Sequence, residues 1–223
     1  MTEFVLMMTR DDVTVPDALE TFQEIAQSGV RCVGFKDIGI DEDSQAQLVN
    51  EIRENGCLTF LEVVDLTEEG EKASAEAAIR SSVDYLVGGT RIEETLGRLD
   101  GSSVRYMPYV GNPVGHPARL VGEIDTIVDE AKDAEQLGVA GVNLLAYRYE
   151  GDPLALTEAV VGAVDIPVLA AGSVNGFERI EALCEIGVWG FTIGGAVMDR
   201  SLVDGSLTDQ IEAVLRAVKA NSR

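Results

Sequence analysis

The sequence predicts an α/β protein in which eight parallel strands and their helices close into one (β/α)8 TIM barrel. Short apolar runs rich in β-branched residues alternate eight times with amphipathic stretches across the 223 residues. Near-continuous apolar strands are typical of parallel sheets that are covered by helices. Eight strand–helix units favour a closed barrel over a doubly wound open sheet, whose G-x-G-x-x-G fingerprint is absent after the first strand. Nothing resembles a linker, so residues 1–223 are predicted to form one domain.

The predicted strands share a short apolar run that ends at polar or glycine residues. They begin near Phe4, Cys32, Leu58, Val83, Val104, Gly141, Pro167 and Trp189. Apolar residues recur at helical spacing over residues 16–28, 44–55, 71–79, 123–137, 153–164 and 176–186. Four of these stretches are followed by a glycine, as helix C-termini prefer: Gly29, Gly56, Gly138 and Gly187.

One connection is longer than the others. Val104 and Gly141 are 37 residues apart, whereas Cys32 and Leu58 are 26 apart. The excess falls in residues 110–120, which are rich in turn residues and carry the only histidine, His116. A long loop after a barrel strand is often a lid or a substrate wall. A neutral surface insertion is the alternative.

The composition excludes several classes of protein. A net charge of −22 disfavours nucleic acid and anionic membranes as partners. No apolar run approaches the roughly 18 residues that span a bilayer, and the N-terminus does not resemble a signal peptide. The three cysteines lie far apart, which fits a reducing cytoplasm. Only four of the 17 basic residues are lysines, and this fits either a high-salt cytoplasm or an arginine-favouring, GC-rich genome.

Lys36 and Glu62 are the first candidates for catalysis. Each interrupts an apolar run near the end of a predicted strand, in VGFKD and TFLEVV. A charge inside such a run is costly unless it is paired or functional. Desolvation is expected to lower the pKa of Lys36, which suits a base, an acid or a Schiff-base nucleophile. The structural alternative is a buried Lys36–Glu62 ion pair, and one pair can serve both purposes.

Asp37 and His116 complete the predicted catalytic set. Asp37 follows Lys36 at the same strand end, although alternation of faces can turn it away from the mouth. His116 has the side chain whose unperturbed pKa lies nearest neutrality, with a surface or hydrogen-bonding role as the alternative.

Further polar residues at the strand ends are predicted to bind substrate: Thr90, Tyr109, Tyr147 and Arg148. The last two are suited to clamp a carboxylate or hydroxyl groups. No cofactor is expected to be required. No pair or triplet has the spacing of a metal site, although scattered carboxylates leave Mg²⁺ as an option.

Two consecutive strand–glycine–helix junctions, AAGSV and TIGGA, point to a phosphate site. Glycine lets the backbone approach a ligand closely, and the following helix directs free N–H groups at the same place. In (β/α)8 barrels phosphate commonly binds after the seventh and eighth strands. The alternative is that these glycines only permit tight turns.

These segments carry a resemblance to a known superfamily. Residues 166–174 (IPVLAAGSV), the helical stretch 177–186 and residues 187–196 (GVWGFTIGGA) resemble the last two strand–helix units of ribulose-phosphate-binding barrels. That superfamily includes histidine-biosynthesis isomerases, pentulose-phosphate epimerases, N-acylmannosamine-6-phosphate epimerases and related decarboxylases. The resemblance implies that phosphate binds at Gly172, Ser173, Gly194 and Gly195.

The segment VGFKD resembles the strand that bears the catalytic lysine of the N-acylmannosamine-6-phosphate epimerases, which implies that role for Lys36. Those enzymes carry an acidic residue just before the seventh-strand glycine, where this chain has Ala171.

Two functions follow as hypotheses. The first is an enzyme that acts on a small phosphorylated sugar or sugar acid, by isomerisation or epimerisation through proton transfer, or by Schiff-base lyase chemistry at Lys36. The second is a non-catalytic phosphometabolite sensor that resembles the glycerol-phosphate-responsive antiterminators and acts through a protein partner. The expected ligand is a phosphorylated small molecule, and a homo-oligomer is left open.

Overall fold

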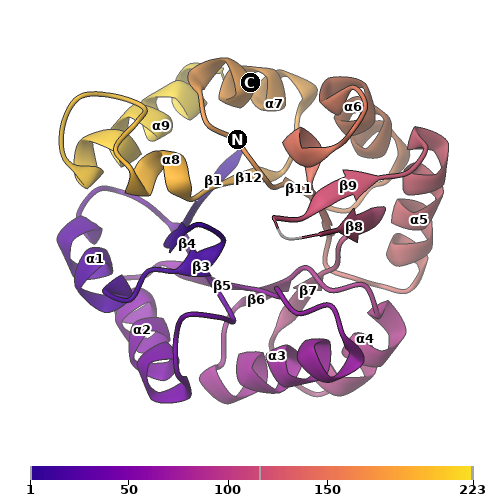
Figure 1. The fold of residues 1–223 in the computed structure, drawn as a ribbon, viewed down its shortest axis with the longest axis horizontal. Coiled ribbons are helices and arrows are strands. Elements are labelled where there is room, and N and C mark those ends of the chain that lie inside the picture. The colour runs from indigo at the N-terminus through magenta and orange to yellow at the C-terminus, as the bar shows by residue number, and fades with distance from the viewer. Residues whose placement is uncertain (1, 116, 222–223) are drawn as a thin grey trace.

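Eight parallel strands form one sheet, in the order β10-β11-β12-β1-β4-β5-β6-β7. The computed structural model describes residues 2–115 and 117–221. The strands are β1 (Glu3–Met7), β4 (Cys32–Lys36), β5 (Leu58–Glu62), β6 (Tyr85–Val87), β7 (Arg105–Met107), β10 (Val142–Leu144), β11 (Val168–Ala170) and β12 (Gly190–Ile193). The first and last strands of this order also meet, because Asn143 N donates to Pro108 O at 2.7 Å. The sheet therefore closes into a barrel, which confirms the predicted fold class (Figure 1).

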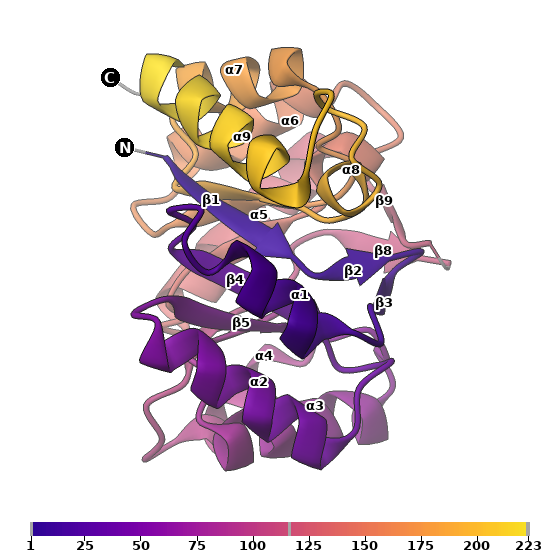
Figure 2. The ribbon, with the colours of Figure 1, turned by 90° about the vertical axis from the view of Figure 1, so that its left-hand side faces the viewer.

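Helices form a ring around this barrel, and Figure 2 shows them running alongside the strands. They are α1 (Ala18–Ile25), α2 (Glu42–Glu54), α3 (Glu68–Ser81), α4 (Ile92–Leu99), α5 (Ile124–Gln136), α6 (Pro153–Ala163), α7 (Phe177–Ile186), α8 (Gly195–Met198) and α9 (Leu207–Asn221). A short 3-10 turn, η1 (Ala146–Arg148), follows β10. In the described part of the chain, no helix is long and apolar enough to cross a membrane.

Alternation along each strand divides the core into two layers. In β5, Leu61 packs in the layer between sheet and helices, whereas Phe60 packs inside the barrel. Tyr85, the first residue of β6, stacks on Phe60 with ring centroids 4.5 Å apart. The Arg105 guanidinium lies 3.8 Å above the Tyr85 ring. These side chains fill the N-terminal end of the barrel, so the open space lies at the C-terminal end.

Two hairpins extend the barrel at its C-terminal end, on the side that faces the viewer in Figure 1. The first pairs β2 (Thr9–Arg10) with β3 (Val13–Thr14), and the second pairs β8 (Asn112–Val114) with β9 (Arg119–Val121). The second hairpin is the long connection that the spacing predicted. The first was not predicted, and its two-residue turn, Asp11–Asp12, has positive φ at both residues.

Three of the four predicted helix ends agree with the structure at the glycines. Gly56, Gly138 and Gly187 stand at the C-terminal ends of α2, α5 and α7 with φ values of 75°, 83° and 87°, the left-handed conformation that terminates helices. Gly29 lies beyond the end of α1, because that helix ends at Ile25 and not at residue 28 as predicted. The stretch predicted at 71–79 belongs to the longer helix α3, which begins earlier because the Thr67 side chain accepts a hydrogen bond from Gly70 N. A side-chain acceptor at this position stabilises the first turn.

Candidate active site

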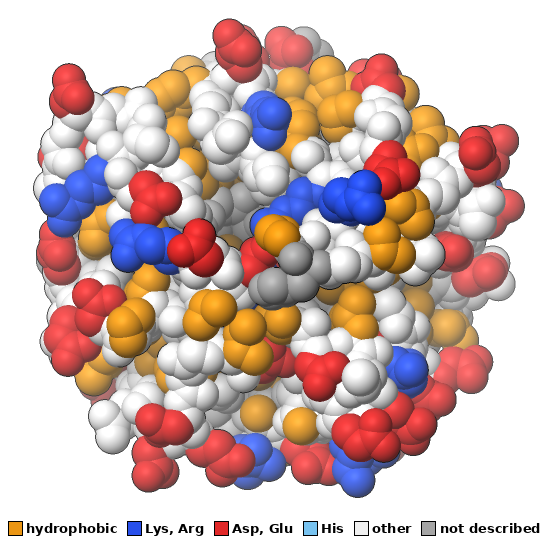
Figure 3. Space-filling model, in the orientation of Figure 1, with side chains coloured by type: hydrophobic (Ala, Val, Ile, Leu, Met, Phe, Trp, Pro, Cys, Tyr) orange, Lys and Arg blue, Asp and Glu red, His pale blue; other side chains and the backbone are white. Residues whose placement is uncertain are grey.

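A cavity of about 550 Å³ opens at the C-terminal end of the barrel. Its walls include both hairpins and the ends of strands that are distant in sequence. Figure 3 shows the same face, with a hollow near its centre and both basic and acidic side chains at the edge. Among the polar residues that line it, five from five segments form one network of contacts: Asp12, Lys36, Glu62, Tyr109 and Arg148.

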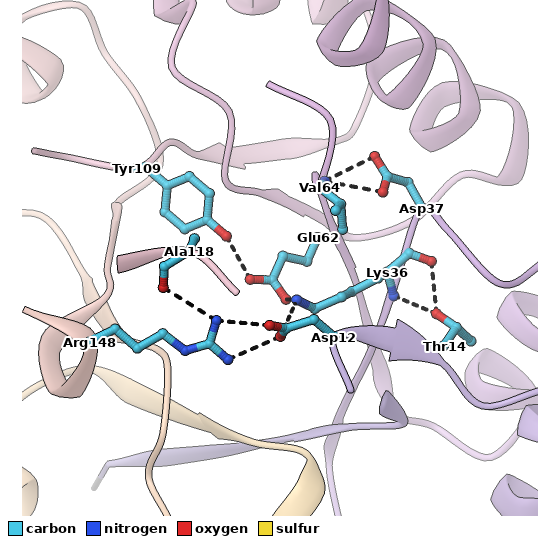
Figure 4. A network of polar contacts seen from close by, with 9 residues as sticks. All are labelled: Asp12, Thr14, Lys36, Asp37, Glu62, Val64, Tyr109, Ala118 and Arg148. Carbon is cyan, nitrogen blue, oxygen red and sulfur yellow. Dashed lines mark hydrogen bonds and ion pairs between the residues drawn. The ribbon is translucent and has the colours of Figure 1, made fainter. Parts of the chain in front are cut away.

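Lys36 lies at the centre of this group (Figure 4). It is the last residue of β4, and the strand register places it beside Glu62 at the end of β5. Lys36 Nζ lies 2.9 Å from Asp12 Oδ1 and 3.4 Å from Glu62 Oε2. The side chain is only 11% exposed. The Lys36–Glu62 ion pair predicted as the structural alternative is therefore present, and it forms part of the cavity wall.

The pKa of Lys36 is raised, not lowered as the sequence led us to expect. Desolvation does oppose its positive charge, but the Glu62 and Asp12 carboxylates together outweigh that effect. The prediction considered burial and one carboxylate, whereas the structure brings a second to the same ammonium group. Lys36 is therefore a charged ammonium at neutral pH.

Asp12 was not predicted as a site residue, yet it connects the two cations of the cavity. Its carboxylate accepts from Lys36 Nζ and, through both oxygens, from the two terminal nitrogens of Arg148 at 3.0 Å each. Burial acts to raise the pKa of Asp12, but Arg148 and Lys36 reverse this and lower it to about 2. A two-residue turn between β-branched residues, in the segment TRDDVT, was the signal that could have revealed it.

Tyr109 fixes the other side of Glu62. Its hydroxyl donates to Glu62 Oε1 at 2.7 Å, so each carboxylate oxygen has its own partner. Burial, and then the adjacent Glu62 carboxylate, raise the pKa of Tyr109 well above its usual value. Tyr109 is therefore a neutral hydrogen-bond donor that orients the carboxylate.

Arg148 and Tyr147 were predicted together but diverge in the structure. Arg148 reaches into the cavity, and its Nη1 also lies 3.5 Å from Ala118 O in the second hairpin. Tyr147 does not line the cavity: its hydroxyl donates to Arg179 O at 3.3 Å. The Arg179 guanidinium lies 4.5 Å from the Tyr147 ring centroid. The 3-10 turn thus separates a cavity residue from one that supports α7.

The glycine junctions predicted to bind phosphate lie in the same cavity. Gly172 and Ser173 follow β11 with φ values of 80° and 58°, while Gly194 and Gly195 follow β12. Within residues 2–115 and 117–221, the N–H groups of Ser173, Gly194 and Gly195 have no hydrogen-bond acceptor. Convergent unpaired N–H groups are suited to an anion. Phosphate binding at this place stays a prediction.

The close packing at Gly194 explains why the residue is glycine. A Cβ atom there would lie 2.4 Å from Thr9 Oγ1. At Gly195, by contrast, the nearest atom would be Asp199 Oδ2 at 3.8 Å. Only the first of the two positions therefore requires glycine for space.

A second Gly-Gly junction, Gly88–Gly89 after β6, differs from the first because a side chain of the protein itself binds the N–H groups that follow it. The Glu71 carboxylate accepts from Thr90 N, Thr90 Oγ1 and Arg91 N, each at 2.9 Å. Glu71 is only 3% exposed. Thr90, predicted to bind substrate, is therefore engaged by an internal carboxylate and does not line the cavity.

Asp37 is also outside the cavity, so the geometry does not support its predicted catalytic role. Its carboxylate accepts from Val64 N at 3.1 Å (Figure 4). It also accepts from Ser74 Oγ, which ties α3 to the barrel. Because successive residues of a strand face opposite sides, the residue after Lys36 faces outward. His116 lies outside the described residues. Among those that are described, no group of three or more histidine, cysteine or acidic side chains is arranged to hold a metal ion.

No protein-family model matches the chain. One stretch is similar to the phosphoribosyl imidazole-4-carboxamide isomerase of Rhodobacter capsulatus, with 37% identity over 103 residues. This stretch is 44% of the chain and 41% of the relative. The chain thus matches less than half the length of that curated protein.

Solved structures match over nearly the whole chain. Orotidine 5′-phosphate decarboxylase of Pyrococcus horikoshii superposes with a TM-score of 0.71 and 11% identity, covering 97% of this chain and 99% of that one. The N-acetylmannosamine-6-phosphate 2-epimerase of Clostridium perfringens gives 0.62 and 13%, covering 97% and 93%. These likenesses, at low sequence identity, show a shared fold, so the predicted resemblance is confirmed at the level of the fold.

Proposed function

We propose that the protein is an enzyme that binds a small phosphorylated sugar or sugar acid and isomerises or epimerises it by proton transfer. The observation that carries the proposal is that one cavity holds both the Lys36–Glu62 pair and the unpaired N–H groups of Gly194 and Gly195. The partial similarity to an isomerase, and the fold shared with a sugar-phosphate epimerase, support the same class of reaction.

The phosphate would bind to the N–H groups that follow β11 and β12. Backbone donors can hold a phosphate without a lysine or arginine, because several N–H groups can donate to one anion. Arg148 packs against this region, since a Cβ at Gly172 would lie 2.9 Å from Arg148 Cγ. The sugar would then extend from the glycines past Arg148 towards Lys36 and Glu62.

Proton transfer next to a carbonyl needs a base for the carbon and a positive group for the oxygen. In the proposed reaction Glu62 removes the proton, and the Lys36 ammonium stabilises the negative charge that develops on the carbonyl oxygen. The Tyr109 hydroxyl keeps the Glu62 carboxylate in place while this occurs. Return of the proton to the same or the neighbouring carbon gives epimerisation or isomerisation.

Schiff-base chemistry at Lys36 is the less favoured variant. An amine must lose its proton before it can attack a carbonyl carbon. Lys36 Nζ contacts two carboxylates and its pKa is raised, so the reactive neutral form is rare at neutral pH. The charged form, by contrast, is the one that proton transfer uses.

The proposal is tested by incubating the protein with a panel of phosphorylated sugars and sugar acids in D2O. Enzymatic proton transfer replaces a carbon-bound hydrogen by deuterium, which mass spectrometry detects even when the equilibrium favours the starting sugar. Lys36→Met should reduce this exchange by about 10²–10⁴-fold. The matched control is Lys72→Met, because Lys72 is an exposed lysine on α3.

Normal exchange in Lys36→Met would refute the assigned role of the lysine. Binding of phosphorylated sugars without exchange or turnover for any of the panel would instead favour the phosphometabolite sensor.

A further inference from the structure

The turn between β2 and β3 holds two adjacent aspartates in an unusual backbone conformation. Asp11 and Asp12 adopt φ values of 52° and 60°. Two-residue hairpin turns with positive φ at both positions prefer asparagine and glycine, because a side chain makes this conformation unfavourable. The barrel mouth therefore keeps a carboxylate where glycine would make the easier turn.

Only one of the two aspartates has partners. Within residues 2–115 and 117–221, Asp11 is exposed and takes part in no hydrogen bond or ion pair. Asp12 has a side chain that is only 12% exposed, and it contacts Lys36 and Arg148. The turn thus directs the second carboxylate inward (Figure 4).

The hairpin is anchored to the strand that carries Lys36. Thr14 Oγ1 in β3 accepts from Lys36 N at 2.8 Å and donates to Lys36 O at 2.9 Å. The backbone of the lysine and its Nζ are therefore both held by residues of the same hairpin. This arrangement fixes the direction of the side chain as well as its partner.

The charges around Lys36 come from several elements. Asp12 in the turn and Glu62 on β5 are the two carboxylates, and Arg148 on η1 is the other cation. Tyr109, in the segment after β7, contacts Glu62, while the Asp37 carboxylate faces Val64 and Ser74. Removal of Asp12 would leave Lys36 and Arg148 to share one remaining carboxylate, which favours loss of the lysine proton.

We propose that Asp12 is a positioning residue that holds Lys36 as an ammonium directed into the cavity, and so commits this lysine to proton transfer instead of imine formation. The inference extends the proposed function, because it explains which of two reactions the lysine can perform. The effect of Asp12 on catalysis rests on the proposed function, whereas its effect on the charge of Lys36 does not. The state of Lys36 itself can be measured without a known substrate.

The test compares Asp12→Asn with Asp11→Asn. Both variants remove one carboxylate from the same turn, and asparagine tolerates positive φ. The probe is pyridoxal 5′-phosphate, whose aldehyde forms an imine with a neutral lysine and releases water. Borohydride then adds hydride to the imine carbon, and peptide mass mapping locates the resulting secondary amine. The protein has four lysines, so Lys72, Lys132 and Lys219 are internal references.

At pH 8, Lys36 in Asp12→Asn should be labelled at least about tenfold faster than in the wild type, which corresponds to a fall of one pKa unit. The labelling rate should rise with pH and level off at a lower pH than in the wild type. In Asp11→Asn the rate should stay within about twofold of the wild type. Equal rates in all three proteins, or a wild-type Lys36 that is already the fastest of the four lysines, would overturn the inference.

Folding is checked separately by circular dichroism, and Asp12→Gly is a second variant whose backbone suits the turn. Deuterium exchange separates this inference from the proposed function. Failure of every phosphorylated sugar to exchange would count against the enzyme, while faster labelling of Asp12→Asn would still support the role of Asp12. Normal exchange together with unchanged labelling would overturn the role of Asp12 alone.

Discussion

Glycine in place of Asp11 is expected to stabilise the protein, whereas glycine in place of Asp12 is expected to destabilise it. Both changes remove backbone strain from the same turn, because a positive φ costs a residue other than glycine roughly 1–2 kcal/mol. The greater freedom of glycine in the unfolded chain offsets about 0.5–1 kcal/mol of that gain. For Asp11, which has no partner among the described residues, the net gain is about 0.5 kcal/mol.

At Asp12 the lost ion pairs outweigh the relieved turn. The pKa of its carboxyl falls from 3.8 to about 2 in the folded protein. One unit corresponds to about 1.4 kcal/mol, so the charged carboxylate contributes about 2 kcal/mol at neutral pH. Its side chain is only 12% exposed, so solvent screens this contribution little. The two glycine variants should therefore differ by about 2 kcal/mol at pH 7.

The difference between the variants should depend on pH in one direction. Because the folded pKa lies below the unfolded one, the contribution of Asp12 is present above pH 3.8 and fades as the pH falls towards 2. Urea unfolding at pH 7 and at pH 2.5, with constant salt, measures the gap directly. Equal stabilities at pH 7, or a gap of the same size at pH 2.5, would refute the reasoning.

Three further predictions concern the rest of the site. Glu71→Gln should lower the free energy of unfolding by about 2 kcal/mol, because charged hydrogen bonds to the start of α4 are lost; a change below about 0.5 kcal/mol in urea unfolding would contradict this. Gly194→Ala should weaken the binding of inorganic phosphate, measured by calorimetry, because the new Cβ would lie 2.4 Å from Thr9 Oγ1. Gly195→Ala should leave the free energy of unfolding unchanged in urea titrations. Equal phosphate affinity in Gly194→Ala and the wild type would argue against the phosphate site. Tyr109→Phe should slow deuterium exchange about tenfold, because the loss of one hydrogen bond to Glu62 is worth about 1.4 kcal/mol; unchanged exchange would show that the hydroxyl does not orient the carboxylate.

The sequence predicted the barrel from its eight strand–helix units, and the Lys36–Glu62 pair from two charges that interrupt apolar runs. Charges that interrupt apolar runs on neighbouring strands must be paired, and strands joined by a helix lie side by side in a parallel sheet. The conformation of a turn is harder to predict from the sequence. Asp12 enters the cavity because two residues adopt positive φ, and the segment around it lacks the glycine or asparagine that usually signals such a turn.

Predicted site residues that lie outside the cavity are bound by partners elsewhere in the chain. Thr90 is bound by Glu71 from a neighbouring helix, and Tyr147 supports α7 through Arg179. Position at a strand end brings a residue near the mouth, but such contacts decide whether its side chain is available. They depend on how the helices pack, which periodicity does not reveal.

Arg148 joins parts of the cavity wall that the chain contributes at very different points. Its guanidinium binds Asp12, 136 residues away, and reaches Ala118 O in the second hairpin. Its stem packs on Gly172. Arg148 therefore links the first hairpin, the second hairpin and the loop after β11. Opening of any of these three segments breaks a contact with Arg148. Amide hydrogen exchange in the three segments should then follow a common opening rate. In Arg148→Met each segment should open at a rate of its own.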